Sequence, residues 1–443
     1  MGPLSIRGGT SAVALSIEFL ARGLLVGLCF VAMQGAGHGQ SENVVCNDGA
    51  GQFTAKTRTG LTVSVGAERD SGFASRACQA TFIWNKKETH VLRDARQVDI
   101  DLMEADLGLG VPVVAFQMKK SSLDASMTYT IYSLAGEPRL LRTITGGDFY
   151  RAADMDLDGH VEILTHDAGA ANGIEGLPLG DFDFPPAIVL RFENRRLIDV
   201  SAEFQDDFDR HIAEVRAQLD PKLLNIFKKS DGKLERLLPE ELSNLHGVMM
   251  TKIGALEIVW AYLYSGREER AWRTLAEMWP TTDIDRIRAS IVDRRAKGIQ
   301  NEVDGVAQPD GMRKKKNRVE VIDLTSEIKT VDMATVLNKR VPDPASTGPL
   351  GSAHQNLAWP VPILLDIPIP PETQAAFPQE GVLLDLVIDG AGKVNAAKLA
   401  NKENTGQLGA MDLAACSGWK FIPAMSFGKA VASHILLTVS PYR

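Results

Sequence analysis

The sequence has 443 residues, which is too many for one hydrophobic core and predicts about two to four domains. Apolar residues make up 44% and charged residues 23%, the proportions of an ordinary globular protein. The net charge is −8, and residues 313–316 form the only basic run. Because a nucleic-acid-binding protein needs a basic face, this charge balance excludes that class.

Residues 1–40 have the pattern of a secretory signal peptide. Residues 23–33 form a short apolar core, and small residues follow up to Gly39, where a signal peptidase could cut. The alternative is an uncleaved inner-membrane anchor, but Glu18 and Arg22 interrupt the apolar run upstream. We therefore expect a cleaved, periplasmic or secreted protein.

Cysteine usage fits an oxidising compartment, because removal of the signal leaves only Cys46, Cys78 and Cys416. Cys46 and Cys78 lie in the same N-terminal region and could form a disulfide. Such a bond would stabilise the fold by about 3 kcal/mol in the chain-entropy model. Cys416 lies in a helical pattern, and we expect it to be a buried free thiol.

Residues 41–205 are rich in β-forming runs separated by turn residues, which predicts a sandwich or a propeller-like sheet. The expected strands cover residues 61–65, 80–84, 111–118, 129–134 and 187–192. Residues 206–300 then show helical periodicity, and a helix over 283–297 is expected to stop at Gly298. Residues 301–356 hold the basic run and many Pro and Gly residues, which predicts an extended linker.

An acidic loop in the β-rich region is the strongest chemical motif of the chain. It runs Asp154-Met155-Asp156-Leu157-Asp158-Gly159-His160-Val161-Glu162. Carboxylates at alternate positions around a glycine turn offer the hard oxygen ligands that suit Ca²⁺. The loop departs from an EF-hand, because its twelfth position is Thr165 instead of Glu. An acidic turn without a metal is the alternative interpretation.

The same motif, followed directly by the apolar run 161–165, resembles the Asp-rich loop of FG-GAP/VCBS repeats. In that family the loop connects two strands of a propeller blade and binds Ca²⁺. The resemblance implies a structural Ca²⁺ held by the side chains of Asp154, Asp156, Asp158 and Glu162 and by the carbonyl group of His160.

Residues 357–443 have the pattern of a small α+β domain. A strand over 382–388 precedes the hairpin signal Asp389-Gly390-Ala391-Gly392, and a second strand over 393–399 follows it. A helix over 409–417, the aromatic pair Trp419 and Phe421 and a last strand over 430–439 complete the pattern.

This order of elements resembles the C-terminal domain of the TonB energy-transducer family. In that family the domain lies in the periplasm and adds a strand of an outer-membrane receptor to its sheet edge, which needs only main-chain hydrogen bonds. The resemblance implies a docking surface at the edge of residues 430–440. The expected partner is a cell-envelope protein such as an outer-membrane β-barrel receptor.

Together these patterns predict a multidomain, periplasmic, non-enzymatic interaction protein with a Ca²⁺-stabilised β module and a TonB-like docking domain. One alternative is a membrane-anchored energy transducer for outer-membrane transport, which would retain the N-terminal anchor. Another is a secreted hydrolase, although the sequence has neither a Gly-x-Ser-x-Gly nor a His-Glu-x-x-His motif. No catalytic residue and no substrate is predicted.

Overall fold

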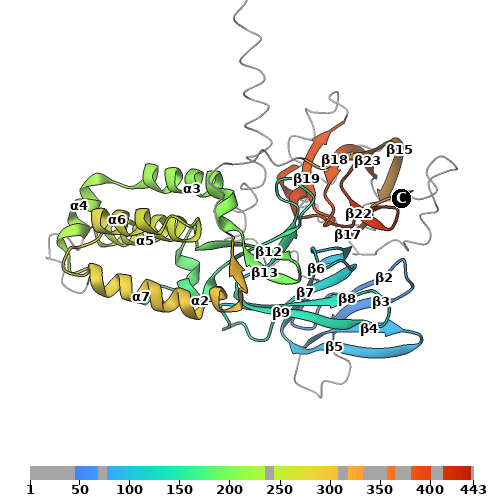
Figure 1. Ribbon diagram of the computed structural model, residues 1–443, viewed down its shortest axis with the longest axis horizontal. Coiled ribbons are helices and arrows are strands. Elements are labelled where there is room, and N and C mark those ends of the chain that lie inside the picture. The colour runs from blue at the N-terminus through green and yellow to red at the C-terminus, as the bar shows by residue number, and fades with distance from the viewer. Residues whose placement is uncertain are drawn as a thin grey trace, which may run out of the picture.

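The computed structural model describes residues 45–67, 77–234, 244–307, 318–332, 357–364, 381–400 and 413–440. The predicted signal peptide lies outside these residues. The described chain is rich in β-structure and contains several sheets, none of which closes on itself. In Figure 1 the helices lie at one end of the molecule, the N-terminal sheets at the other, and the C-terminal strands beside those sheets.

The first two sheets are antiparallel and pack against each other. One has the order β2-β3-β4-β5 and the other β1-β6-β7-β8-β9. Their bounds are β1 Cys46–Asn47, β2 Phe53–Lys56, β3 Thr62–Ala67, β4 Cys78–Trp84, β5 Lys87–Ala95, β6 Gln97–Ala105, β7 Val113–Lys119, β8 Met127–Ser133 and β9 Arg139–Gly147. Apolar side chains from both sheets fill the space between them, including Phe53, Val63, Phe82, Ile100, Phe116 and Tyr132.

A disulfide bond joins these two sheets. It links Cys46 of β1 to Cys78 of β4, with 5.9 Å between their Cα atoms. The pairing that the sequence suggested is therefore confirmed. The remaining cysteine of the described chain, Cys416, is buried as a free thiol, as predicted.

The third sheet follows in the order β10-β11-β12-β13-β14. Its strands are β10 Arg151–Ala153, β11 Glu162–His166, β12 Ala187–Glu193, β13 Arg196–Asp199 and β14 Gly305–Val306. The short helix α2, Ala168–Ala171, and a 3-10 helix, Leu179–Asp181, lie between β11 and β12. The strand predictions for 61–65, 80–84, 111–118, 129–134 and 187–192 coincide largely with β3, β4, β7, β8 and β12.

Among its described residues, the helical region contains five longer helices: α3 Gln205–Gln218, α4 Pro221–Lys229, α5 Leu245–Tyr264, α6 Glu268–Met278 and α7 Ile284–Lys297. Helix α5 is apolar on nearly all sides and is buried along most of its length, and α3, α4 and α6 pack against it. Helix α7 ends at Gly298 as predicted. Further 3-10 helices cover Ser201–Phe204 and Ile299–Glu302.

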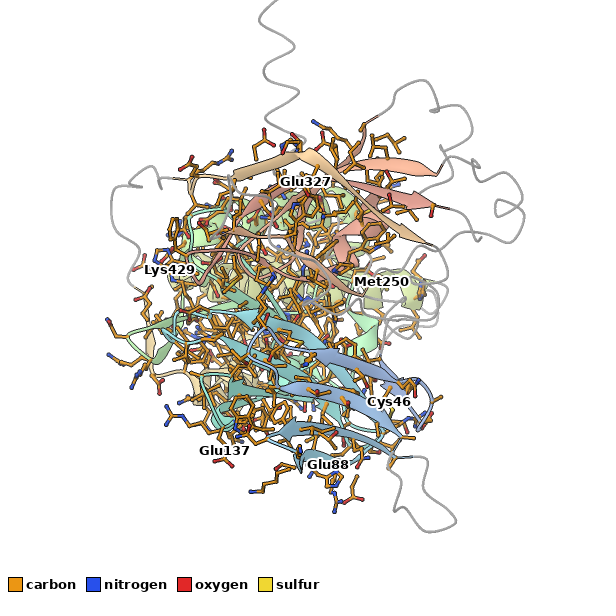
Figure 2. All side chains as sticks on the ribbon, turned by 90° about the vertical axis from the view of Figure 1, so that its right-hand side faces the viewer. Cys46, Glu88, Glu137, Met250, Glu327 and Lys429 are labelled. Carbon is orange, nitrogen blue, oxygen red and sulfur yellow. A yellow bond between two sulfur atoms is a disulfide. The ribbon has the colours of Figure 1, made fainter. Side chains whose placement is uncertain are left out.

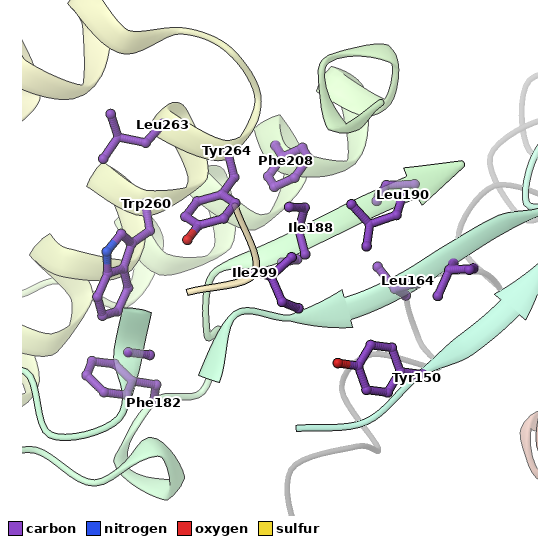
Figure 3. Close-up of a cluster of buried hydrophobic side chains, with 14 of the residues drawn as sticks. Tyr150, Leu164, Phe182, Ile188, Leu190, Phe208, Trp260, Leu263, Tyr264 and Ile299 are labelled. Carbon is purple, nitrogen blue, oxygen red and sulfur yellow. The ribbon is translucent and has the colours of Figure 1, made fainter. Parts of the chain in front are cut away.

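One continuous core connects the third sheet to the helices. Figure 3 shows Ile188 of β12 beneath Phe208 of α3 and Tyr264 of α5, with Trp260 against Phe182. The Phe182 and Trp260 rings meet edge to face with their centroids 5.1 Å apart. This shared core fixes the helices to the β10–β14 sheet.

The C-terminal strands form one four-stranded sheet in the order β15-β23-β18-β19 and two smaller ones. The main strands are β15 Ile322–Asp332, β18 Val382–Ile388, β19 Val394–Leu399 and β23 Ser433–Ser440. The smaller sheets use β16 Leu357–Ala358, β17 Val361–Leu364, β20 Lys420–Ile422, β21 Ala424–Ser426 and β22 Lys429–Val431, and a 3-10 helix covers Leu413–Gly418. We call residues 318–332, 357–364, 381–400 and 413–440 the C-terminal unit.

Three expectations about this unit were wrong. Residues 301–356 do not form a continuous linker, because 322–332 are strand β15, which pairs in parallel with β23. Strand β23 also pairs with β18 on its other side, so the predicted docking edge at 430–440 is covered by the protein's own chain. The predicted last strand is interrupted at Ala432, which separates β22 from β23.

Candidate functional site

The acidic loop connects β10 to β11 and is held by its own first carboxylate. Asp154 accepts hydrogen bonds from the backbone N–H groups of Asp158 and Gly159, each at 2.9 Å. Leu157 and Gly159 adopt positive φ angles of 57° and 90°, which lets the chain turn back within so few residues. The loop is therefore an ordered turn set by its Asp and Gly spacing.

Three of the five predicted ligands come together. Ligand atoms of Asp154, Asp156 and Glu162 all lie within 4.8 Å of one another. Asp158 points instead toward His160: its Oδ1 accepts from the His160 backbone N–H at 2.9 Å and lies 3.1 Å from Nδ1. The close group of side chains therefore does not include the Asp158 carboxylate, and the His160 carbonyl group, the fifth predicted ligand, stays a prediction.

Burial and neighbouring carboxylates disfavour the charged forms of Asp154 and Glu162. Burial, followed by the nearby charge of Asp389, raises the pKa of Asp154 to about 7. Burial, followed by the charge of Asp156, raises the pKa of Glu162 well above its ordinary value. Arg191 lies 3.4 Å from Glu162 and compensates part of this charge. Carboxylate oxygens that are buried together in this way are the donors that suit a hard divalent cation such as Ca²⁺.

The acidic loop also contacts the C-terminal unit at three points. The Asp154 N–H donates to Asp389 Oδ2 at 2.8 Å, and Asn395 Nδ2 donates to the Asp154 carbonyl at 2.9 Å. The Val319 N–H donates to the Leu157 carbonyl at 2.8 Å. The loop predicted as a metal site therefore lies at the junction between the β-sheets and the C-terminal unit.

The β18–β19 turn, which the sequence predicts as a hairpin, reaches into this junction. Asp389 Oδ1 accepts from the backbone N–H groups of Ala391 and Lys393, at 2.9 and 2.8 Å. Gly392 has a φ of 81°, and a Cβ atom there would lie 1.8 Å from the Phe421 carbonyl oxygen. Only glycine fits this close approach, so the turn chemistry sets the position of Lys393.

Two lysines of the C-terminal unit form ion pairs with two aspartates on β6. We call these four residues, Asp99, Asp101, Lys393 and Lys420, the lysine lock. Lys393 Nζ lies 2.6 Å from Asp101 Oδ1 and donates to the Asp101 carbonyl at 2.5 Å. Lys420 Nζ lies 2.7 Å from Asp99 Oδ2 and donates to the Ile100 carbonyl at 2.7 Å. Both lysines therefore hold backbone as well as side-chain groups of one strand.

Asp101 is ionised in this environment. Burial alone would raise its pKa, but the charges of Lys393 and Lys420 and the hydrogen bonds hold that pKa below its ordinary value. Its second oxygen accepts from the Tyr129 hydroxyl at 2.6 Å and from the Ala152 N–H at 2.9 Å. The side chains of Asp101 and Lys393 are only 2% and 3% exposed, which makes theirs a fully buried ion pair.

Sequence reasoning missed the lysine lock, although β6 carries a signal for it. In the run Val98-Asp99-Ile100-Asp101, Val98 and Ile100 enter the core between the first two sheets. Side chains alternate along a strand, so both aspartates face the opposite side. Two buried acids on one face of an apolar strand indicate a cationic partner, but nothing local in the sequence identifies Lys393 or Lys420.

Arg58 adds a second attachment from the first sheet. Its Nη1 lies 2.8 Å from Glu104, and its Nη2 donates to the carbonyl groups of Trp359 and Pro423, each at 3.1 Å. Apolar residues of the C-terminal unit, Val361, Ile363 and Ile422, belong to the core between the first two sheets. Figure 2 shows the consequence: the strands around Cys46 and the C-terminal strands are stacked, with Glu327 of β15 on the far side.

Comparison of the chain with models of protein families, with curated proteins and with solved structures gives no match. Among the described residues, no helix combines the length and the apolar character needed to cross a membrane.

Proposed function

We propose that the chain is a non-enzymatic interaction protein of the periplasm, in which a TonB-like C-terminal unit is fixed to an FG-GAP/VCBS-like β module. The observation that carries this proposal is the lysine lock, which joins the β18–β19 turn and β20 to β6 through ion pairs. Three successive antiparallel meanders, β2–β5, β6–β9 and β10–β13, support the comparison with β repeats. The Cys46–Cys78 bond supports an oxidising compartment.

The outer edge of β15 is the docking surface in this proposal. Within the described chain β15 pairs only with β23, and Figure 2 places Glu327 of β15 away from the N-terminal sheets. The other outer strand, β19, is tied to the acidic loop through Asn395. Ile328 of β15 is 55% exposed, so an added strand would cover an apolar side chain as well as pair with the main-chain groups on the side of β15 that no described strand covers.

A lysine placed on β15 should block this docking. We expect Ile328→Lys to weaken capture of a cell-envelope β-barrel protein about tenfold, because a charged side chain on an edge strand opposes pairing. Capture is measured with purified protein, cross-linking and mass spectrometry of the bound partner. Val292→Lys is the matched control, since Val292 of α7 is 51% exposed and lies in the helical region. Equal capture by both variants, or no β-barrel partner for the unchanged protein, contradicts the proposal.

A structural Ca²⁺ belongs to the same proposal, with Asp154, Asp156 and Glu162 as its side-chain ligands. Binding to the folded state alone should stabilise it by about 2.7 kcal/mol at a concentration of 100 times Kd. Ca²⁺ should therefore raise the thermal midpoint of the unchanged protein, and a chelator should reverse the rise. The midpoint is measured by circular dichroism.

The Ca²⁺ effect has a matched pair of variants. Asp156→Asn should abolish the rise in midpoint, whereas Asp181→Asn, a change at an exposed acid outside the loop, should preserve it. A midpoint that does not respond to Ca²⁺ in the unchanged protein rules out the metal part of the proposal without affecting the docking part.

A further inference from the structure

The centre of strand β15 carries side chains in the order polar, acidic, apolar, basic and polar. These residues are Ser326, Glu327, Ile328, Lys329 and Thr330. All five are at least partly exposed, and within the described chain β15 pairs on one side only, with β23. In the reverse direction the order exchanges acid for base and is otherwise unchanged. The segment is therefore chemically complementary to an antiparallel copy of itself.

The two charges of this segment lie on one face of the strand, because they are two residues apart. Lys329 Nζ lies 3.2 Å from Glu327 Oε2, and the two side chains are 41% and 42% exposed. The Lys329 ammonium group also lies 5.4 Å from the ring centroid of Trp359, which belongs to the core of the C-terminal unit. Both charges thus stand at the rim of the core-facing side, within reach of a further strand.

Ile328 points to the opposite face of the sheet. It lies opposite Leu436 of β23, which is half-buried, and is itself 55% exposed. A second β15 strand placed beside the first would continue this row, with Leu436 and Ile328 of one chain followed by Ile328 and Leu436 of the other. The pairing would remove exposed apolar surface from water on both chains.

The charges also favour one register. If Ile328 lies opposite Ile328 of a second copy, Glu327 lies opposite Lys329 of that copy, and the two-fold symmetry makes the same attractive pair twice. A slip of two residues instead sets Glu327 opposite Glu327, or Lys329 opposite Lys329. Charges on an edge strand commonly oppose pairing, but these two oppose the neighbouring registers and support this one.

We propose that the outer edge of β15 binds a second copy of this chain, so that two C-terminal sheets join through antiparallel β15 strands with Ile328 at the two-fold axis. The inference rests on the proposed function in one respect, since both take this edge to be open to a strand. A strand of a β-barrel protein and a second copy would occupy the same edge, so each excludes the other.

The test is a charge exchange on the full chain, followed by analytical ultracentrifugation. Glu327→Lys and Lys329→Glu should each weaken self-association at least tenfold, because symmetry turns two attractive pairs into two repulsive ones. An equimolar mixture of the two variants should regain dimers, since each chain then offers the charge that the other lacks. The matched control is Glu88→Lys, a change at an exposed acid on the outer strand β5, and it should associate like the unchanged protein.

Engineered cysteines test the register. Ile328→Cys should form a disulfide-linked dimer under mild oxidation, because facing Cα atoms of an antiparallel pair lie about 4.5 to 5.5 Å apart. Ser326→Cys should not, since this register separates the two substituted positions by about 14 Å along the strands, too far for a disulfide. Circular dichroism of each variant confirms that it is folded.

Three results overturn the inference. They are an unchanged protein that sediments as a monomer at every soluble concentration, equal association of Glu327→Lys and Glu88→Lys, and a mixture of the two charge variants that regains no dimer. A monomer that still captures a β-barrel protein removes the second copy and leaves the proposed docking intact. A dimer without β-barrel capture removes the proposed partner and leaves this inference intact.

Discussion

Replacement of Lys393 with methionine is expected to lower the free energy of unfolding by about 3 to 5 kcal/mol. The substitution leaves the ionised, buried carboxylate of Asp101 without the ammonium group that lies 2.6 Å from it. The change is measured by urea unfolding, followed by circular dichroism. Hydrogen exchange should locate the effect at β6 and at the β18–β19 turn, where the C-terminal unit meets the sheets.

Lys398→Met is the matched control for this substitution. Lys398 lies on the same hairpin, but its side chain is 71% exposed, and it pairs with Asp385 at 3.1 Å. An exposed ion pair contributes at most about 1 kcal/mol, so this variant should remain close to the unchanged protein. A second variant, Lys393→Met with Asp101→Asn, removes both charges and should recover part of the loss. Equal stability of Lys393→Met and Lys398→Met contradicts the assignment of the lysine lock as a buried attachment.

The lysine lock changes how the C-terminal unit can act. A docking domain that moves freely on a linker would keep its charged turn in water. Here the turn that carries Lys393 is buried against β6, and Arg58 binds two carbonyl groups of the same unit. In the proposed docking, a partner would therefore meet the C-terminal sheet and the N-terminal sheets as one joined surface, and it would bind the edge of β15 without movement of the whole unit.

Local patterns predicted the elements whose periodicity is strong. The alternation in Val382–Ile388 predicted β18 with its observed bounds, and Gly298 marked the end of α7. The spacing of Asp154, Asp156 and Glu162 predicted their convergence, because a short loop leaves few ways to arrange alternate side chains. These features depend on residues within about ten positions of one another, which is the range that sequence patterns report.

The features that the sequence did not predict depend on distant pairings. Strand β15 has an edge-strand composition, with Asp323, Glu327 and Lys329 among its residues, and its partner β23 begins about a hundred positions later. The polar composition of β15 is therefore typical of a linker, and no local pattern indicates its parallel pairing with β23. Lys393 follows a glycine-rich turn of a kind that is usually solvated, and its burial depends on Asp101 in another sheet. No local periodicity reports such a contact.

Loss of the Cys46–Cys78 bond is expected to lower the free energy of unfolding by about 3 kcal/mol, because the bond closes a loop with a sequence separation of 32. The double variant Cys46→Ala with Cys78→Ala, and the unchanged protein under reducing agent, should show the same loss in urea unfolding. The bond joins β1 to β4, so its removal also loosens the packing of the first two sheets. Cys416→Ala is the control and should keep its sensitivity to reducing agent.

The same bond also tests where the protein resides. Free thiols are alkylated first in the folded protein and then after unfolding without a reducing agent. In chains that have been exported and cleaved, these two steps together should label only Cys416, since Cys46 and Cys78 are paired. Uncleaved chains kept in the reducing cytosol should label Cys46 and Cys78 as well as Cys416 and the retained Cys29, because glutathione keeps such thiols reduced. Full labelling of Cys46 and Cys78 in protein recovered from the periplasm would contradict the bond. An unlabelled pair there would mean that the N-terminal sheets gain the stability of the bond only after the chain is exported.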